Sequence, residues 1–83
     1  MDKVKVKVLI NTIDKVKKFA ELAGKYNFDI DLAAGRYVVD AKSIMGIFSL
    51  NLVEEMDCII YTNKEDAQKF INTIDTMIVK STY

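Results

Sequence analysis

The sequence predicts one small α+β domain with the element order βαββαβα. Alternating apolar residues mark strands, apolar residues spaced by three and four mark helices, and the two patterns take turns along the chain. The chain has 83 residues, of which 51% are hydrophobic and 29% are charged. This length and composition are typical of a single globular domain, here covering residues 1–83, with a thin two-layer core.

The first predicted strand covers residues 3–10, because apolar and basic residues alternate there with the period of a half-buried strand. Its apolar side consists of Val4, Val6, Val8 and Ile10, and its polar side of Lys3, Lys5 and Lys7.

A helix is predicted over residues 12–25. Apolar residues recur there at three- and four-residue intervals, which gives the helix one buried stripe. Either Asn11 or Thr12 can cap its first turn. Gly24 lies where a left-handed residue is expected to end it. The stripe consists of Ile13, Val16, Ala20 and Ala23, widened by Phe19 and Leu22.

A β-hairpin is predicted next, from Phe28 to Val39. Apolar residues alternate with Asp29 and Asp31, and a second β-rich run begins at Tyr37. The turn falls at Gly35, which can adopt the positive φ that tight hairpin turns require.

Three more elements complete the order. Residues 41–52 fit a short helix that Ser43 can cap, although Gly46 weakens it. Residues 58–61 read as a mostly buried strand. Residues 62–65 match a capping box that begins at Thr62, and the helical period then continues from Ala67 to Ile78.

The residue types that are absent from the sequence, or occur only once, limit the possible functions most. The chain has no His, which excludes a catalytic imidazole, a His zinc site and a phosphohistidine relay. Cys58 is its only cysteine, so no intramolecular disulfide can form, and an apolar strand favours an inert thiol. A hydrolase of the acylphosphatase type needs an anion loop with an arginine, but Arg36 stands on the hairpin turn. We therefore expect a protein that is not an enzyme and has no cofactor and no metal.

Charge is balanced overall but distributed unevenly. Twelve basic and twelve acidic residues cancel, so nothing favours a nucleic-acid partner. Residues 1–27 carry seven lysines against three acidic residues, a net charge of +4, and residues 28–83 carry −4. These lysines either solvate one strand and one helix or form a basic docking surface. The opening MDKVKVKV contains no apolar run that fits a signal peptide or membrane span, which predicts a cytoplasmic protein without a membrane partner.

The most specific motif in the chain is KSIMGIFSL, from Lys42 to Leu50. It resembles the regulatory-serine helix of HPr, the phosphocarrier of the bacterial sugar phosphotransferase system, whose Gram-positive signature is close to K-S-I-M-G-h-h-S-L with h apolar. A weaker resemblance extends over nearly the whole chain, including Lys25-Tyr26, the strand from Asp29 to Leu32, the Gly35-Arg36 turn and the last helix. The resemblance implies an open-faced sandwich, in which a four-stranded antiparallel sheet carries its helices on one face.

The resemblance breaks down at the phosphoryl-carrying site. HPr carries its phosphoryl group on a His at the start of the first helix, followed closely by an Arg and a Pro, and these positions correspond to Thr12, Asp14 and Lys15. A threonine phosphate ester lacks the transfer potential of a phosphoramidate, and Asp14 would repel a phosphate. We therefore expect a family member that cannot relay phosphohistidine, similar to the catabolite-repression paralogue of HPr, which is regulatory only.

The matching serine, Ser43, is retained. The resemblance implies that it is phosphorylated by HPr kinase, and a phosphate at a helix N-terminus is favoured by the helix dipole and free amides. A plain N-cap explains the residue equally simply. The resemblance also implies a partner-docking patch at Ile44, Met45 and Phe48, although core residues show the same spacing. Nearby basic residues that could extend the patch, or simply be solvated, are Lys42, Lys17 and Lys18.

Two functions remain open at this point. The first is a regulatory module in sugar transport and catabolite repression that binds phosphotransferase or regulatory proteins as a monomer or weak homodimer. The second is a small structural or ligand-binding sandwich that has lost the family interactions. The second predicts that Ile44, Met45 and Phe48 pack inward, so their exposure separates the two.

Overall fold

A computed structural model describes residues 2–79 of the protein, and its elements follow the predicted order. In chain order they are β1 (Val4–Val8), α1 (Ile13–Ala23), β2 (Ile30–Ala34), β3 (Tyr37–Asp40), α2 (Ile44–Phe48), β4 (Met56–Ile60) and α3 (Lys64–Thr73), followed by a 3₁₀ turn, η1 (Asp75–Met77).

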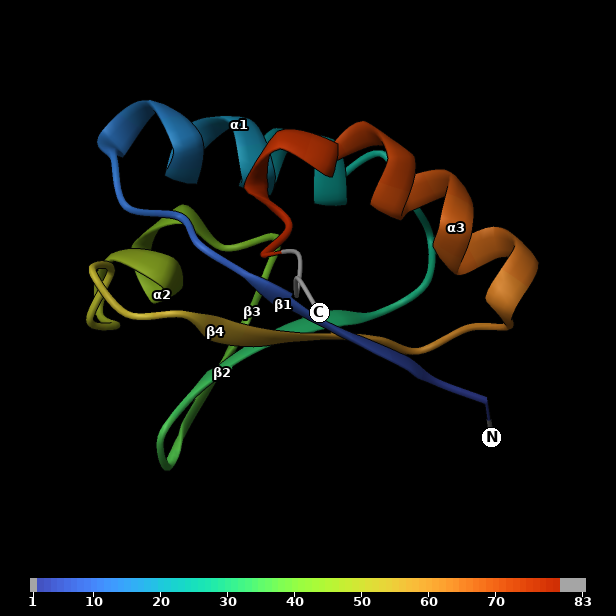
Figure 1. Ribbon diagram of the computed structural model, residues 1–83, viewed down its shortest axis with the longest axis horizontal. Coiled ribbons are helices and arrows are strands. Elements are labelled where there is room, and N and C mark those ends of the chain that lie inside the picture. The colour runs from blue at the N-terminus through green and yellow to red at the C-terminus, as the bar shows by residue number, and fades with distance from the viewer. Residues whose placement is uncertain (1, 80–83) are drawn as a thin grey trace.

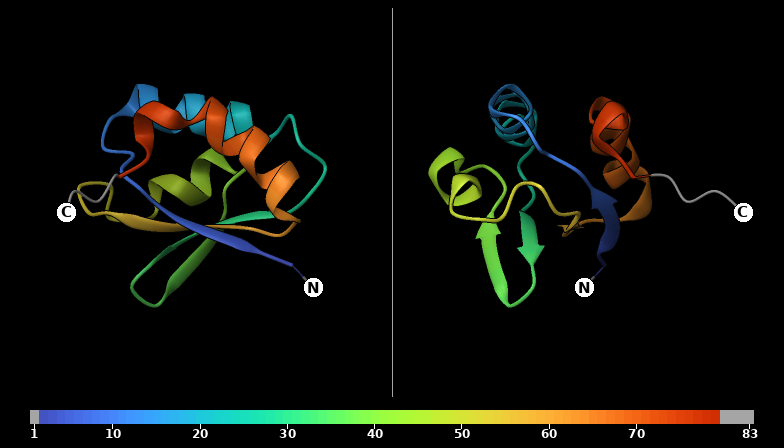
Figure 2. Two further views of the ribbon diagram at one scale, coloured as in Figure 1. Left: turned by 45° about the vertical axis from the view of Figure 1, so that its right-hand side comes forward. Right: turned by 60° about the vertical axis from the view of Figure 1, so that its left-hand side comes forward.

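The four strands form one antiparallel sheet in the order β1-β4-β2-β3. The helices lie on one side of this sheet, with α1 and α3 above it and α2 beside them (Figures 1 and 2). No helix of residues 2–79 lies on the other side. The predicted open-faced sandwich is therefore confirmed, and its helices and sheet make up the two layers.

The core lies between the helices and the inner face of the sheet. Alternate residues of each central strand point into it, as the two-residue period of a strand requires. Phe19 of α1 and Phe70 of α3 are fully buried and meet edge to face, with ring centroids 5.7 Å apart. These two rings join both long helices to the same core.

The lysines of β1 lie on the open side of the sheet. Lys7 pairs with Asp57 of β4, its partner in the strand register, with Nζ and Oδ1 2.9 Å apart. Hydrogen bonding to Lys7 lowers the pKa of the Asp57 carboxyl below its usual value. At least one of the seven N-terminal lysines is thus neutralised within the fold.

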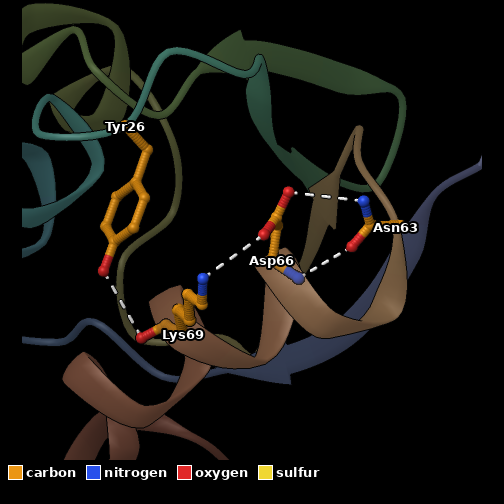
Figure 3. Close-up of polar contacts among 4 residues, drawn as sticks. All are labelled: Tyr26, Asn63, Asp66 and Lys69. Carbon is orange, nitrogen blue, oxygen red and sulfur yellow. Dashed lines mark hydrogen bonds and ion pairs between the residues drawn. The ribbon is translucent and has the colours of Figure 1, made fainter.

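Two predicted helix ends are wrong. Gly24 follows α1 with φ −65° and ψ −15°, so it is not left-handed, and its N–H bonds to Ala20 O and Leu22 O. The capping residue of α3 is Asn63 rather than Thr62. Asn63 Oδ1 accepts from the Asp66 N–H at 2.8 Å, and Asn63 Nδ2 donates back to Asp66 Oδ2 at 3.3 Å (Figure 3). A reciprocal cap exists, but it starts one residue later because Asn is as good a cap as Thr.

The helix predicted to reach Ile78 also ends earlier, at Thr73. Ile78 instead forms an antiparallel bridge with Val8 of β1. A long-range contact with the sheet therefore overrides the local helical period. No helix within residues 2–79 is long and apolar enough to cross a bilayer.

The helix predicted over residues 41–52 is only five residues long, Ile44–Phe48. Ser49 and the residues after it turn toward β4, which begins at Met56 rather than Cys58. Gly35 has φ +61° and Arg36 a negative φ. This is the pattern of a type II′ hairpin turn, as Gly at the first central position suggests.

Candidate protein-docking site at the second helix

Thr12 is the N-cap of α1. Its Oγ1 accepts a hydrogen bond from the Lys15 N–H at 3.1 Å, which settles the choice between Asn11 and Thr12. Asn11 Oδ1 accepts from Lys15 Nζ instead, at 3.2 Å. Asp14 lies in the first turn, where the helix dipole favours a carboxylate. The start of α1 therefore stabilises the helix with its own side chains and presents an acidic group where a phosphate-binding helix would present a basic one.

Ser43 is the N-cap of α2, as predicted. Its Oγ accepts from the Gly46 N–H at 3.1 Å, and its carbonyl accepts from Ile47 N at 3.0 Å. The residue is half-buried. A Cβ on Gly46 would lie 3.2 Å from Ser43 Oγ and 3.4 Å from Val39 Cβ. The glycine that weakens the helix thus gives the serine hydroxyl room, a role that its helix propensity did not reveal.

The apolar residues of α2 divide between the core and the surface. Ile47 is fully buried, whereas Ile44, Met45 and Phe48 are 41%, 79% and 37% exposed. We call these three exposed residues the α2 face. They lie at helical positions i, i+1 and i+4. Met45 is the most exposed and lies nearly opposite Ile47 on the helix, whereas Ile44 and Phe48 lie between these two positions. Their exposure contradicts the inward packing that the structural alternative predicts.

The basic residues near α2 have different surroundings. Lys42 Nζ donates to the Tyr26 carbonyl at 2.8 Å, and Lys42 N donates to Asp40 Oδ1 at 2.8 Å. Lys42 therefore links the start of α2 to the loop before β2. Lys17 and Lys18 are exposed on α1, and Lys18 Nζ lies 3.8 Å from Glu21 Oε1. A docking role for these lysines stays a prediction.

Ile13 differs from its predicted place. The helical period put it in the buried stripe of α1, but it is exposed in the first turn. Its position directly after the cap, as the first residue of α1, is the one signal in the sequence that could have revealed this. An exposed apolar side chain therefore stands next to Thr12.

Cys58 is fully buried in β4. Burial raises the pKa of its thiol to about 12, with a smaller contribution from the charge of Asp31. The predicted inert state of the thiol follows from both. Within residues 2–79, no three His, Cys, Asp or Glu side chains are close enough to hold a metal ion.

We expect alkaline pH to destabilise the fold through Cys58. The unfolded thiol ionises from about pH 9, whereas the folded thiol stays protonated up to about pH 12. The contribution of Cys58 to stability is complete below the unfolded pKa and falls as pH rises through this window. Urea unfolding at several pH values would measure this loss. In Cys58→Ala, the free energy of unfolding should fall less steeply as pH rises from about 9 to 12. An equally steep fall in the wild type and in Cys58→Ala would contradict the role assigned to Cys58.

Comparison with known proteins places this chain in a family. The sequence model described as the PTS HPr component phosphorylation site matches residues 14–80. The chain belongs to the HPr family. HPr-like phosphocarriers of the bacterial phosphotransferase system are thus its relatives, as the KSIMG motif suggested. The match begins after Thr12, and no curated protein matches the chain.

Solved HPr structures share the fold. HPr from Bacillus anthracis has a TM-score of 0.73 and 20% identity, covering 95% of this chain and 100% of its own. HPr-C-His from Thermoanaerobacter tengcongensis has a TM-score of 0.65 and 24% identity, covering 92% and 89%. Crh, the catabolite repression protein of Bacillus subtilis, whose structure is described as a domain-swapped dimer, has a TM-score of 0.62 and 22% identity, covering 93% and 90%. At these identities the structural similarity supports the HPr fold alone.

Proposed function

We propose that this chain is a non-catalytic regulatory member of the HPr family that acts in the cytoplasm. In this proposal it binds protein partners through the α2 face, is switched by phosphorylation of Ser43, and does not carry a phosphoryl group between phosphotransferase components. The observation that carries the proposal is the exposed α2 face directly beside a serine whose hydroxyl lies at a helix N-terminus.

The start of α1 supports the proposed absence of phosphoryl transfer. The 83 residues include no imidazole, and Thr12 takes the place that the family gives to its His. The Thr12 hydroxyl already accepts the Lys15 N–H as a cap. A phosphate there would also face the charge of Asp14 in the same turn. Both the chemistry of the ester and the local charge oppose a carrier role.

A regulatory role is supported by what surrounds Ser43. A phosphate on its Oγ would add about −1.5 to −2 charges next to three exposed apolar side chains. Binding of an apolar partner surface to the α2 face would then become unfavourable, while a partner with an arginine cluster would be favoured. The similarity to Crh, a catabolite repression protein, agrees with such a role.

The proposal is tested by the intact mass of the protein after two incubations. With enzyme I and phosphoenolpyruvate we expect no added phosphate. With HPr kinase and ATP we expect one phosphate on the wild type and none on Ser43→Ala. A phosphorylated product in the first incubation would overturn the carrier-deficient assignment, and an unmodified wild type in the second would overturn the assignment of Ser43.

A fold control separates chemistry from damage in this test. Ser43→Ala removes the cap of α2, and loss of such a cap costs about 0.5–2 kcal/mol. Ser43→Asn keeps a capping side chain that cannot be phosphorylated. Both variants should therefore stay unmodified, while Ser43→Asn should unfold at nearly the same urea concentration as the wild type.

A further inference from the structure

The edge of the sheet formed by β1 is covered. Lys7 O accepts from Val79 N and Leu9 N donates to Met77 O, both at 2.9 Å, so the segment after α3 pairs with this edge. The lysines of β1 also place repeated positive charge along the strand, which disfavours pairing with another chain.

The opposite edge, formed by β3, has neither protection. β3 pairs with β2 alone among the described strands. Its first three residues, Tyr37, Val38 and Val39, are uncharged, and Val38 is 59% exposed. Uncharged, exposed edge strands of this kind are templates for pairing with another strand.

The backbone of Val38 points toward this free edge. Ala41 N donates to Ile30 O at 2.9 Å, which sets the phase of hydrogen bonding between β2 and β3. By the two-residue alternation of an antiparallel pair, the amides of Val38 and Asp40 are directed away from β2. The Asp40 carbonyl accepts from Ser43 N, whereas within residues 2–79 the Asp40 amide donates to no turn or loop carbonyl.

The two ends of β3 carry opposite charge. Arg36, the only arginine, precedes the strand, and it has no ion-pair partner within residues 2–79. At the other end Asp40 lies opposite Asp31 in the register, and Asp29 lines the same open depression as both. A strand that is basic at one end and acidic at the other is complementary to itself when it runs antiparallel.

We propose that β3 pairs with β3 of a second copy of this chain, in an antiparallel register centred on Val38. In this register Val38 lies opposite the partner's Val38, and their outward N–H and C=O groups bond reciprocally. Arg36 lies opposite the partner's Asp40 at both ends, because the pairing is two-fold symmetric. Two four-stranded sheets thereby become one continuous antiparallel sheet.

The pairing is weak and transient by this reasoning, because it joins short strands and buries little surface. The pairing involves neither Ser43 nor the α2 face, so it can be tested independently of the regulatory role proposed above. We expect the partner strand to be β3 of a second copy rather than an arbitrary peptide. In an antiparallel pair of two β3 strands, the basic end of each strand faces the acidic end of the other.

Amide hydrogen exchange followed by NMR tests this interface. Between micromolar and millimolar protein, we expect exchange of the Val38 and Asp40 amides to slow several-fold. The Val39 amide points toward β2 and is the internal reference, so its exchange should not change. Sedimentation equilibrium over the same range should show growth from monomer to dimer mass. A chain that stays monomeric at millimolar concentration, or a dimer whose concentration-dependent protection lies on β1, overturns the proposal.

Two variants with matched controls test the register. Arg36→Glu places like charges opposite each other twice and should weaken dimerisation by about ten-fold or more, whereas Arg36→Lys should change it little. Val38→Pro removes the outward amide and should weaken it by at least about ten-fold, whereas Val38→Thr keeps that amide and the β-branched shape. Spectra of dilute samples check that each variant is folded. A dimer unaffected by Arg36→Glu contradicts the charge-paired register.

Discussion

Replacing Met45 with Glu is expected to lower kcat/KM for phosphorylation of Ser43 by HPr kinase at least about ten-fold, because a charge replaces the most exposed apolar side chain of the α2 face. The fold should not change, since Met45 is 79% exposed. The measurement is the initial rate of phosphate incorporation at several protein concentrations. This prediction depends on the proposed regulatory role and tests which surface the kinase contacts.

Val53→Glu is the matched control for this experiment. Val53 is 76% exposed, nearly as much as Met45, but lies in the loop after α2 rather than on the α2 face. The Val53→Glu substitution adds the same charge at a similarly exposed apolar position, so the rate of Ser43 phosphorylation should not change. An equal fall in both variants would show that general charge repulsion, rather than contact with the α2 face, controls the reaction.

Replacing Phe70 with Ala is expected to have the largest effect on stability, a loss of about 3–5 kcal/mol. Phe70 is fully buried and meets two rings edge to face, that of Phe19 at 5.7 Å and that of Tyr26 at 5.5 Å between centroids. Since a small domain is stable by only about 5–15 kcal/mol, much of its stability would be lost. Urea unfolding monitored by circular dichroism measures the change.

Phe28→Ala is the control for this second experiment. Phe28 packs against the same Tyr26 ring at 5.2 Å but is only half-buried. It should therefore lose clearly less stability, because less apolar surface returns to water and a smaller cavity forms. Equal losses for the two variants would mean that contact with Tyr26, rather than burial between α1 and α3, governs the effect.

The local parts of the fold could be predicted because their signals are local. Alternation, helical spacing, the Gly35 turn and the Ser43 cap each depend on a few neighbouring residues. Helix ends were harder to predict. Asn63 and Thr62 are both good caps, and only the built helix shows which hydroxyl or amide oxygen reaches a free N–H.

The candidate site was predictable in identity but not in exposure. The motif from Lys42 to Leu50 indicated the family, yet helical spacing leaves open which side of α2 meets the core. The structure buries Ile47 and exposes Met45. In the structure the Lys42 ammonium also donates a hydrogen bond to the Tyr26 carbonyl. These residues are far apart in the chain, so no local sequence pattern predicts the contact.

The sequence by itself determined the element order, the family and the absence of an imidazole, because these are properties of residue identity and spacing. The tertiary structure alone decided which residues lie on the surface and which edge of the sheet is free. Ile78 leaves its helical period because it meets Val8 of β1. Among the described strands, β3 pairs with β2 alone, and its outer edge is left free because the strand order puts it at the end of the sheet. Both outcomes depend on long-range packing, where burial and backbone pairing outweigh local preference.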